Sequence, residues 1–237
     1  MTPLVRSAGL SSSQVKKAGS LVRRARRDGL TSGQEVDALA EAINIIETHR
    51  ATFRAPLVTA NNGLRSMVRT LGIDGQVSQR LKRMPTILDK LEREPTLALD
   101  RMQDIGGCRA VVRTRDDVTR LAERLAMRRP PKRVADYVAQ PRQSGYRGIH
   151  VIVEYGSDCP RPIEVQIRTV LMHQWATTVE DISGNSGINY KMDGASPMQL
   201  FLECYARVLD FADRGEAVPD GLLDEYGTLV NTAFDRS

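Results

Sequence analysis

Two acidic residues stand at the edges of apolar stretches, where a carboxylate could bind a metal ion. Asp104 precedes two glycines in the segment DIGGCR, and Glu164 lies within the segment IEVQIRT. Apolar and polar residues alternate in IEVQIRT, which predicts a strand with Ile163 and Val165 facing the core and Glu164 on the opposite face. On neighbouring strands the two acids would form the oxygen-rich pair that Mg²⁺-dependent phosphoryl transfer requires. Alone, DIGGCR is better explained as a helix-to-strand turn capped by Asp104.

Basic and aromatic residues accompany these acids in further segments. The segment RLKR places positive charge just ahead of a predicted helix that carries another lysine. Such a cluster beside a helix start suits phosphate groups, although by itself it is also typical of solvated surface. The segment SGYRGIH combines an aromatic ring with a histidine, and IEVQIRT continues its polar face with an amide and a guanidinium. The residues are Arg80, Lys82, Arg83 and Lys90, then Tyr146, His150, Gln166 and Arg168.

The composition is that of an ordinary soluble protein of 237 residues, with 41% hydrophobic and 27% charged residues. No apolar run is long enough to cross a bilayer, and the basic N-terminus lacks the apolar segment of a secretory signal. Three widely spaced cysteines without a CxxC pair predict a reduced, cytoplasmic protein. The net charge of +5 and the isoelectric point near 9.3 favour polyanionic partners such as nucleotides or RNA.

Helices dominate both ends of the predicted fold. The basic segment QVKKAGSLVRRARRDG predicts an amphipathic helix that ends at Gly29. A second helix is expected to start after Ser32 and to turn one apolar stripe towards the domain body. That stripe consists of Val36, Leu39, Ile43 and Ile46. Asn-Gly at 62–63 and Asp-Gly at 74–75 predict breaks, and PTILDKLERE predicts a helix from Pro85.

Strands are expected in the middle of the chain. CRAVVRT, IHVIVEY and IEVQIRT read as strands, whereas DDVTRLAERLAM returns to a helical period. A basic, proline-broken loop is expected over 128–148, and helices follow Val170 with an interruption at SGNSGINYKMDG. These elements predict an α/β (α+β) domain, in which helices flank a mixed sheet. No Walker A, Rossmann or zinc pattern is present.

Three longer motifs resemble the synthetase domain of the RelA/SpoT family. DIGGCRAVV, DYVAQPRQSGYRGIH and IEVQIRTVLMHQWA occur here in the order of that family. The resemblance implies a nucleotidyltransferase-like fold and the transfer of pyrophosphate from ATP to a nucleotide 3′-hydroxyl. Nothing resembles the family's hydrolase motif, so a small single-domain synthetase is expected. Its predicted organisation is a helical extension over 1–58, the synthetase domain over 59–195 and a second helical extension over 196–237.

The resemblance also implies roles for individual residues. Asp104 and Glu164 would hold Mg²⁺, and Glu164 would act as base for the attacking hydroxyl. Tyr146 would stack on the acceptor base, with His150 on the acceptor side, while Trp175 and His173 are read mainly as packing. The ATP site would use Arg80, Lys82, Arg83, Lys90 and Arg109, with Arg113 and Arg115 as candidates for stacking on adenine. The acceptor site would add Lys132, Arg133, Gln166 and Arg168.

Two departures from the family keep the acceptor open. Ala135 stands where alarmone synthetases commonly have a lysine that holds acceptor phosphates, and Glu180-Asp181 replaces a Glu-His pair. The expected partners are ATP and GDP or GTP, with Lys132 and Arg133 as substitutes for the missing lysine. The alternative is a toxin that modifies the 3′-CCA end of tRNA and has a neutralising antitoxin; a further alternative is an inactive nucleotide or RNA sensor. For an RNA acceptor, the candidate contacts with the phosphate backbone are Arg23, Arg24, Arg26 and Arg27.

Overall fold

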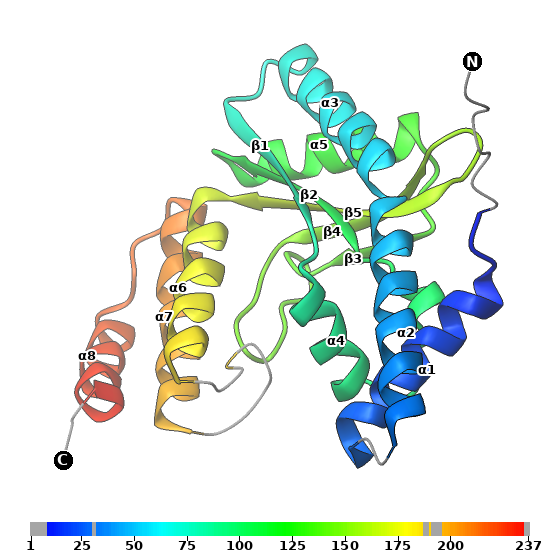
Figure 1. The fold of residues 1–237 in the computed structure, drawn as a ribbon. Helices are drawn as coiled ribbons and strands as arrows, with labels where there is room; N and C mark the ends of the chain where they lie inside the picture. Colours follow the sequence, from blue (N-terminus) through cyan, green and yellow to red (C-terminus); the bar gives the residue numbers. More distant parts are fainter. Residues whose placement is uncertain (1–8, 30–31, 187–189, 191–195, 235–237) are drawn as a thin grey trace. The chain divides into compact units, whose positions relative to one another are not determined.

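A computed structural model describes residues 9–29, 32–186, 190 and 196–234 of the chain (Figure 1). Its helices are α1 (Ser12–Asp28), α2 (Gly33–Ala51), α3 (Arg54–Thr70), α4 (Met84–Arg93), α5 (Arg115–Arg128), α6 (Val170–Ser186), α7 (Pro197–Arg214) and α8 (Asp220–Phe234), with a short 3-10 helix, η1 (Leu99–Arg101). Its strands are β1 (Gly75–Leu81), β2 (Gly106–Val112), β3 (Arg133–Asp136), β4 (Ile149–Tyr155) and β5 (Arg161–Thr169).

The described strands form one sheet in the order β1-β2-β5-β4-β3. In β2 buried and half-buried residues alternate, with Cys108 and Ala110 inside. In β5 Ile163 and Val165 are fully buried and Glu164 between them is half-buried, as the alternation predicted. The strands β3 and β4 pair antiparallel, with Ala135 opposite His150. The mixture of strands and flanking helices expected from the sequence is therefore present.

Internal contacts divide the chain into two compact units. The first unit contains residues 1–60, 79–107 and 154–164. Within it α1 packs on α2, α4 and η1 (Figure 1). The helices pack closely at Gly19. A Cβ added there would lie only 2.8 Å from the Cβ of Leu99, so a larger residue would not fit without a shift. The buried face of α1 consists of Val15, Ala18, Gly19 and Val22.

The second unit contains residues 61–78, 108–153 and 165–237. Within it α6 and α7 lie side by side, and α8 packs on α7 (Figure 1). Trp175 and Val179 of α6 and Phe201, Leu202 and Ala206 of α7 belong to one buried cluster. The indole N–H of Trp175 donates to the backbone oxygen of Leu202 over 2.9 Å, so the two helices are joined by a hydrogen bond as well as by packing.

Several local expectations are confirmed. The first helix ends at Gly29, whose φ of +80° suits a residue without a Cβ, and Ser32 caps the next helix by accepting from the N–H of Glu35. Pro85 lies in the first turn of α4. The segment SGNSGINYKMDG falls partly outside the described residues, and its first residues belong to α6.

Other local expectations are wrong. Val36 and Ile43 are exposed, because α2 turns Ala42, Ile46 and His49 towards its packing partners instead. The Asn-Gly pair at 62–63 does not end a helix, because it lies inside α3. A buried stripe of Leu57, Ala60, Leu64 and Val68 stabilises that helix against the cost of an internal glycine, about 1 kcal/mol. The strand β1 was not predicted, and the supposed loop over 128–148 contains β3.

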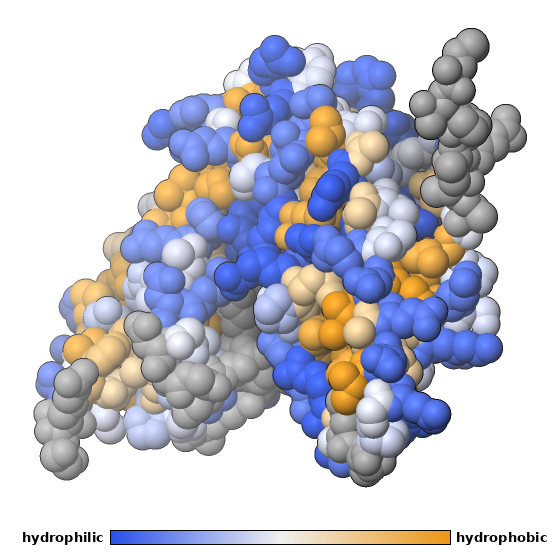
Figure 2. Space-filling model, viewed as in Figure 1, coloured by the Kyte–Doolittle hydropathy of each residue, from blue (hydrophilic) through white to orange (hydrophobic). Residues whose placement is uncertain are grey.

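The surface agrees with the charged composition. Hydrophilic residues cover much of the face seen in Figure 2, with smaller hydrophobic patches among them. Of the helices in the described ranges, none is long and apolar enough to span a bilayer.

Candidate active site

Asp104 lies in the turn before β2 and is surrounded by cations of the first unit. Its Oδ2 accepts from the ammonium group of Lys82 over 2.8 Å and from that of Lys90 over 2.9 Å. Its Oδ1 is buried and has no hydrogen-bond partner among the described residues. Burial raises the pKa of Asp104, but the attraction of both lysines outweighs it and holds the pKa below its usual value. The carboxylate is therefore ionised, and one of its oxygens is available to a cation.

Backbone geometry brings these lysines to Asp104. Lys82 directly follows β1, and its N–H donates to the carbonyl of Ile105 over 2.8 Å, which fixes the end of β1 beside the start of β2. Its own carbonyl accepts from Arg50 of α2 over 2.7 Å. Lys90 lies in the last turn of α4. The cation pair thus depends on where β1 ends and on where α4 is held.

The helix α1 holds α4 through two arginines. Arg23 Nε donates to the carbonyl of Leu91 over 2.7 Å, and another of its nitrogens reaches the carbonyl of Leu97. Carbonyls in a last helical turn lack partners within the helix, so this contact satisfies one of them. Arg26 forms ion pairs of 2.9 Å and 2.8 Å with Asp89 and Glu92 of α4. Two of the four arginines considered for RNA binding therefore hold α4, and a third, Arg27, forms a surface ion pair of 2.7 Å with Asp28.

Glu164 lies on β5, the neighbour of β2 in the sheet. A Cβ added at Gly107 would lie 3.7 Å from the backbone oxygen of Glu164 and 3.9 Å from that of Arg80, so β2 passes between the other two strands here. No group of three or more His, Cys, Asp or Glu side chains suited to a metal ion occurs among the described residues. Two carboxylates fit Mg²⁺, which leaves much of its coordination shell to phosphate oxygens and water.

The predicted acceptor residues gather in the second unit. Arg168 is only 3% exposed. One of its terminal nitrogens donates to the hydroxyl of Tyr146 over 2.6 Å and to the amide oxygen of Gln166 over 2.8 Å. The same hydroxyl is hydrogen-bonded to Nε2 of His150. The Nε and the other terminal nitrogen of Arg168 are buried without a partner in the described part of the chain.

The ring of Tyr146 is only 7% exposed. It meets the rings of Tyr137, His150 and Trp175 edge to face, at centroid distances of 5.6, 5.5 and 6.1 Å. The guanidinium of Arg142 lies 4.6 Å from the Tyr137 ring centroid and 5.8 Å from that of Tyr146. Sequence reasoning overlooked Tyr137 and Arg142, although both lie within the motif DYVAQPRQSGYRGIH. Tyr137 is the more accessible ring of the two tyrosines.

The remaining predicted residues lie elsewhere. Arg80 and Arg83 are exposed beside Lys82. Arg109 is half-buried and lies on the same face of β2 as Gly107. Lys132 and Arg133 are exposed at the start of β3, and Trp175 is buried, as predicted for packing. Burial lowers the pKa of His173.

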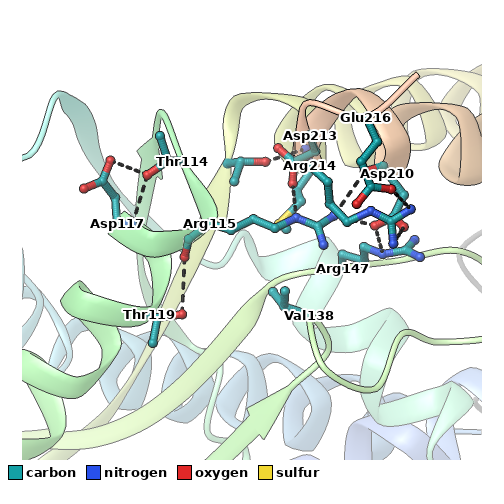
Figure 3. A network of polar contacts seen from close by, with 12 residues as sticks. Thr114, Arg115, Asp117, Thr119, Val138, Arg147, Asp210, Asp213, Arg214 and Glu216 are labelled. Carbon is teal, nitrogen blue, oxygen red and sulfur yellow. Dashed lines mark hydrogen bonds and ion pairs between the residues drawn. The ribbon is translucent and has the colours of Figure 1, made fainter. Parts of the chain in front are cut away.

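Two predicted contacts to adenine are engaged in ion pairs with acids of the same unit. Arg113 contacts Asp74 on the surface at 2.7 Å. Arg115, the first residue of α5, contacts Asp210 and Asp213 of α7 instead of pointing to open space (Figure 3). Their assignment to the ATP site stays a prediction.

Residues 79–194 match the family model described as the region found in RelA / SpoT proteins. Over these residues the chain is similar to the RelA/SpoT family. The chain is 33% identical over 135 residues to the GTP pyrophosphokinase YjbM of Bacillus subtilis, a match that covers 53% of this chain and 61% of that protein. The chain therefore spans less than two-thirds of this relative's length.

Two solved structures from Bacillus subtilis share the fold. Small alarmone synthetase 2 superposes with a TM-score of 0.62 at 20% identity, covering 71% of this chain and 94% of that one. Small alarmone synthetase 1, bound to its product pppGpp, gives 0.58 at 26% identity, covering 70% and 93%. The predicted fold class and the RelA/SpoT resemblance are thereby confirmed.

Proposed function

We propose that the protein transfers the β,γ-pyrophosphate of ATP to the 3′-hydroxyl of GDP or GTP. The observation that carries this proposal is the ionised Asp104, which two lysines fix through one oxygen. Its other oxygen is buried and has no partner among the residues that the structure describes. Asp104 lies in the turn before β2, the strand that neighbours the β5 strand of Glu164, within the RelA/SpoT region. The relative YjbM is named a GTP pyrophosphokinase, and small alarmone synthetase 1 was solved with the product pppGpp. Both names favour a guanine nucleotide as acceptor.

The donor side follows from the charges around Asp104. Asp104 and Glu164 would hold Mg²⁺, which when bound neutralises negative charge on the triphosphate. Lys82 and Lys90 would place their ammonium groups against the phosphates, with Arg80 and Arg83 exposed nearby for further contacts. These cations stabilise the charge that spreads over the phosphate oxygens during transfer.

Glu164 would act as the base of the proposed reaction. Its carboxylate takes the proton of the acceptor 3′-hydroxyl, and the hydroxyl oxygen forms a bond to the β-phosphorus of ATP. The bond between the β-phosphorus and the oxygen that bridges it to the α-phosphorus breaks, and AMP leaves with that oxygen. No redox partner is needed, because the step only exchanges one phosphorus–oxygen bond for another.

The acceptor side draws on the cluster around Arg168. Arg168 is 3% exposed, and two of its guanidinium nitrogens lack a partner within the described ranges, which is unfavourable. An acceptor that brings anionic or carbonyl oxygens would relieve this cost. Tyr146 and Tyr137 would supply aromatic surface for the base. Both rings lie within the reach of Arg142, so stacking of a base requires this arginine to move aside.

A tRNA 3′ end remains a second candidate acceptor because of one residue. Ala135 replaces the phosphate-holding lysine of the alarmone synthetases, and it pairs with His150 across β3 and β4. Ala135 therefore shares a face of the sheet with His150, but unlike a lysine it offers no positive charge to acceptor phosphates. Arg24 is exposed on α1 and could contact RNA, and so could Arg27, whose ion pair with Asp28 lies on the surface.

The test is a single set of parallel incubations. ATP labelled in its γ-phosphate is offered with GDP, GTP, ATP or bulk tRNA in the presence of Mg²⁺, and Glu164→Gln serves as the inactive control. Label on GDP or GTP supports the proposal, and label on tRNA alone replaces the acceptor. If no acceptor is labelled while nucleotides still bind, the protein is a sensor and the proposed activity is refuted.

A further inference from the structure

The helix α7 lies beyond the matched RelA/SpoT region, yet it binds the segment that carries Tyr146. Asp210 of α7 forms an ion pair of 2.9 Å with Nε of Arg147, the residue directly after Tyr146 (Figure 3). The side chain of Asp210 is only 13% exposed. An ion pair at this depth is screened little by solvent, so it constrains the chain more than a surface pair would.

Packing places the same segment against the same face of α7. Gly145 has a φ of +89°, and a Cβ there would lie 2.4 Å from the Cβ of Ala206. Ala206 and Asp210 are four residues apart, so they lie on one face of the helix. A larger residue at position 145 would force the segment away from α7. The segment 145–147 is therefore fixed to α7 by a close contact at one end and an ion pair at the other.

Asp210 belongs to a larger set of paired charges. Asp210 also accepts from Arg115, whose Nε lies 2.7 Å from Asp213 of the next turn. The side chain of Asp213 is 4% exposed. Arg214 lies 3.5 Å from Asp210 and 3.0 Å from Glu216, which balances its charge (Figure 3). Buried acids destabilise a protein strongly when a partner is lost, so the arginines are needed where they are.

The ring of Tyr146 depends on α7 at a second point. The ring packs at 6.1 Å from that of Trp175, whose indole N–H is bound to the carbonyl of Leu202 in α7. The carbonyl of Tyr146 accepts from the N–H of Arg142 over 3.2 Å, which closes the loop behind it. The ring of Tyr146 is therefore packed against a partner that is bound to α7, while its neighbours Gly145 and Arg147 contact α7 directly.

We propose that Asp210 is a positioning residue for the acceptor side, and that through Arg147 it sets the place of Tyr146. The acceptor part of this inference rests on the proposed function. Asp210 itself touches no substrate; it acts by keeping the segment 145–147 ordered before the acceptor binds. Ordering the backbone costs conformational entropy, so an anchor that is already formed improves acceptor binding without adding a contact.

The test compares Asp210→Asn with Arg207→Gln. Arg207 lies on the same helix, but its ion pair with Glu225 is on the surface. For Asp210→Asn we expect the KM for the acceptor nucleotide to rise about ten- to a hundredfold, because Tyr146 is no longer held in place. The KM for ATP should rise less, even though Arg115, a candidate ATP contact, also loses its pairing with Asp210. Hydrogen exchange of the amides 145–148 should become faster. Asp210→Glu keeps the charge and should recover most of both effects, and Arg207→Gln should show neither.

Each outcome decides the inference. An unchanged acceptor KM or unchanged amide exchange in folded Asp210→Asn overturns it, and so does an equal loss for ATP and acceptor. If Asp210→Asn fails to fold, Arg147→Gln leaves Asp210 paired with Arg115 and must show the same split. If the wild type transfers no pyrophosphate, the proposed function fails. The positioning of Tyr146 is then decided by amide exchange alone, because that readout needs no activity.

Discussion

The ammonium group of Lys90, in the last turn of α4, lies 2.9 Å from Oδ2 of Asp104, an oxygen that it shares with Lys82 at 2.8 Å. Two cations on one carboxylate oxygen keep the acid ionised in spite of its burial. The arrangement also leaves the other oxygen without a partner in the described part of the chain. The electrostatics of the candidate donor site therefore depend on α4 as much as on the acids themselves.

Removal of Lys90 should change the response of the protein to acid. The pKa of Asp104 is lowered in the folded state, so its contribution to stability is present above the unfolded pKa of about 3.9 and is lost as the pH falls through the folded pKa. In Lys90→Met, burial is opposed by one lysine fewer, so Asp104 takes up its proton at a higher pH. Urea unfolding measured over the acid range should show stability falling at a higher pH than in the wild type.

The control for this experiment is Arg93→Met, at the exposed end of the same helix. It removes a similar charge without a contact to Asp104. If both variants lose stability over the same pH range, the pairing of Lys90 with Asp104 has no part in the acid response.

Neutralising either acid should stop the reaction. Asp104→Asn and Glu164→Gln should each reduce pyrophosphate transfer about a hundredfold or more, because an amide is a poor Mg²⁺ ligand and a poor base. Thermal unfolding, recorded alongside, identifies any loss that comes from the fold. Glu123→Gln, on the exposed side of α5, is the matched control and should keep full activity. Near-normal transfer by either acid variant at saturating Mg²⁺ would rule out the assigned roles.

The arginines of α1 should differ in how much they contribute to the free energy of unfolding. Arg23→Ala removes the donors to the carbonyls of Leu91 and Leu97 and should lower the free energy of unfolding by about 1–3 kcal/mol. Arg24→Ala, at the exposed neighbouring position, should change it by less than about 0.5 kcal/mol. Chemical denaturation measures both. Equal effects of the two substitutions would show that Arg23 does not hold α4.

The acceptor can be tested at position 135. Ala135→Lys would place an ammonium group on the face of β3 that His150 shares, as in the alarmone synthetases that the motifs resemble. One charge-assisted contact contributes about 1.5–3 kcal/mol, so the KM for GDP or GTP should fall about tenfold or more. Val134→Lys is the control, because Val134 is 52% exposed and points to the opposite face of the strand.

If tRNA is the acceptor, substitutions at position 135 and in α1 should have different effects. Ala135→Lys would leave labelling of tRNA unimproved, whereas Arg24→Gln together with Arg27→Gln would weaken it and reduce its salt dependence by about 0.7–0.9 in the log–log slope per lost phosphate contact. Guanine nucleotides should be unaffected by the two arginine substitutions, since exposed charges beyond about 10 Å are screened at ordinary ionic strength.

Local patterns in the sequence were enough to predict those elements in which buried and exposed residues follow a regular period. The alternation in IEVQIRT predicted that Ile163 and Val165 would be buried and Glu164 would not, because a strand turns successive side chains to opposite faces. Gly29 marked the end of α1, because a positive φ favours a residue without a Cβ. The longer motifs identified the RelA/SpoT region and named Asp104 and Glu164 before any contact was known.

Only the tertiary structure decided which residues meet over long separations. The strand β1 has a polar sequence with no regular burial, so its pairing with β2 could not be predicted from periodicity. Asp210 reaches Arg147 and Arg115 across more than sixty residues of chain, and no motif marks it. The resemblance implied that Tyr146 stacks on the acceptor base, and only the structure shows that the rings packed around it leave it 7% exposed. Such contacts depend on how separate elements pack, and a local pattern carries information only about the face of its own element.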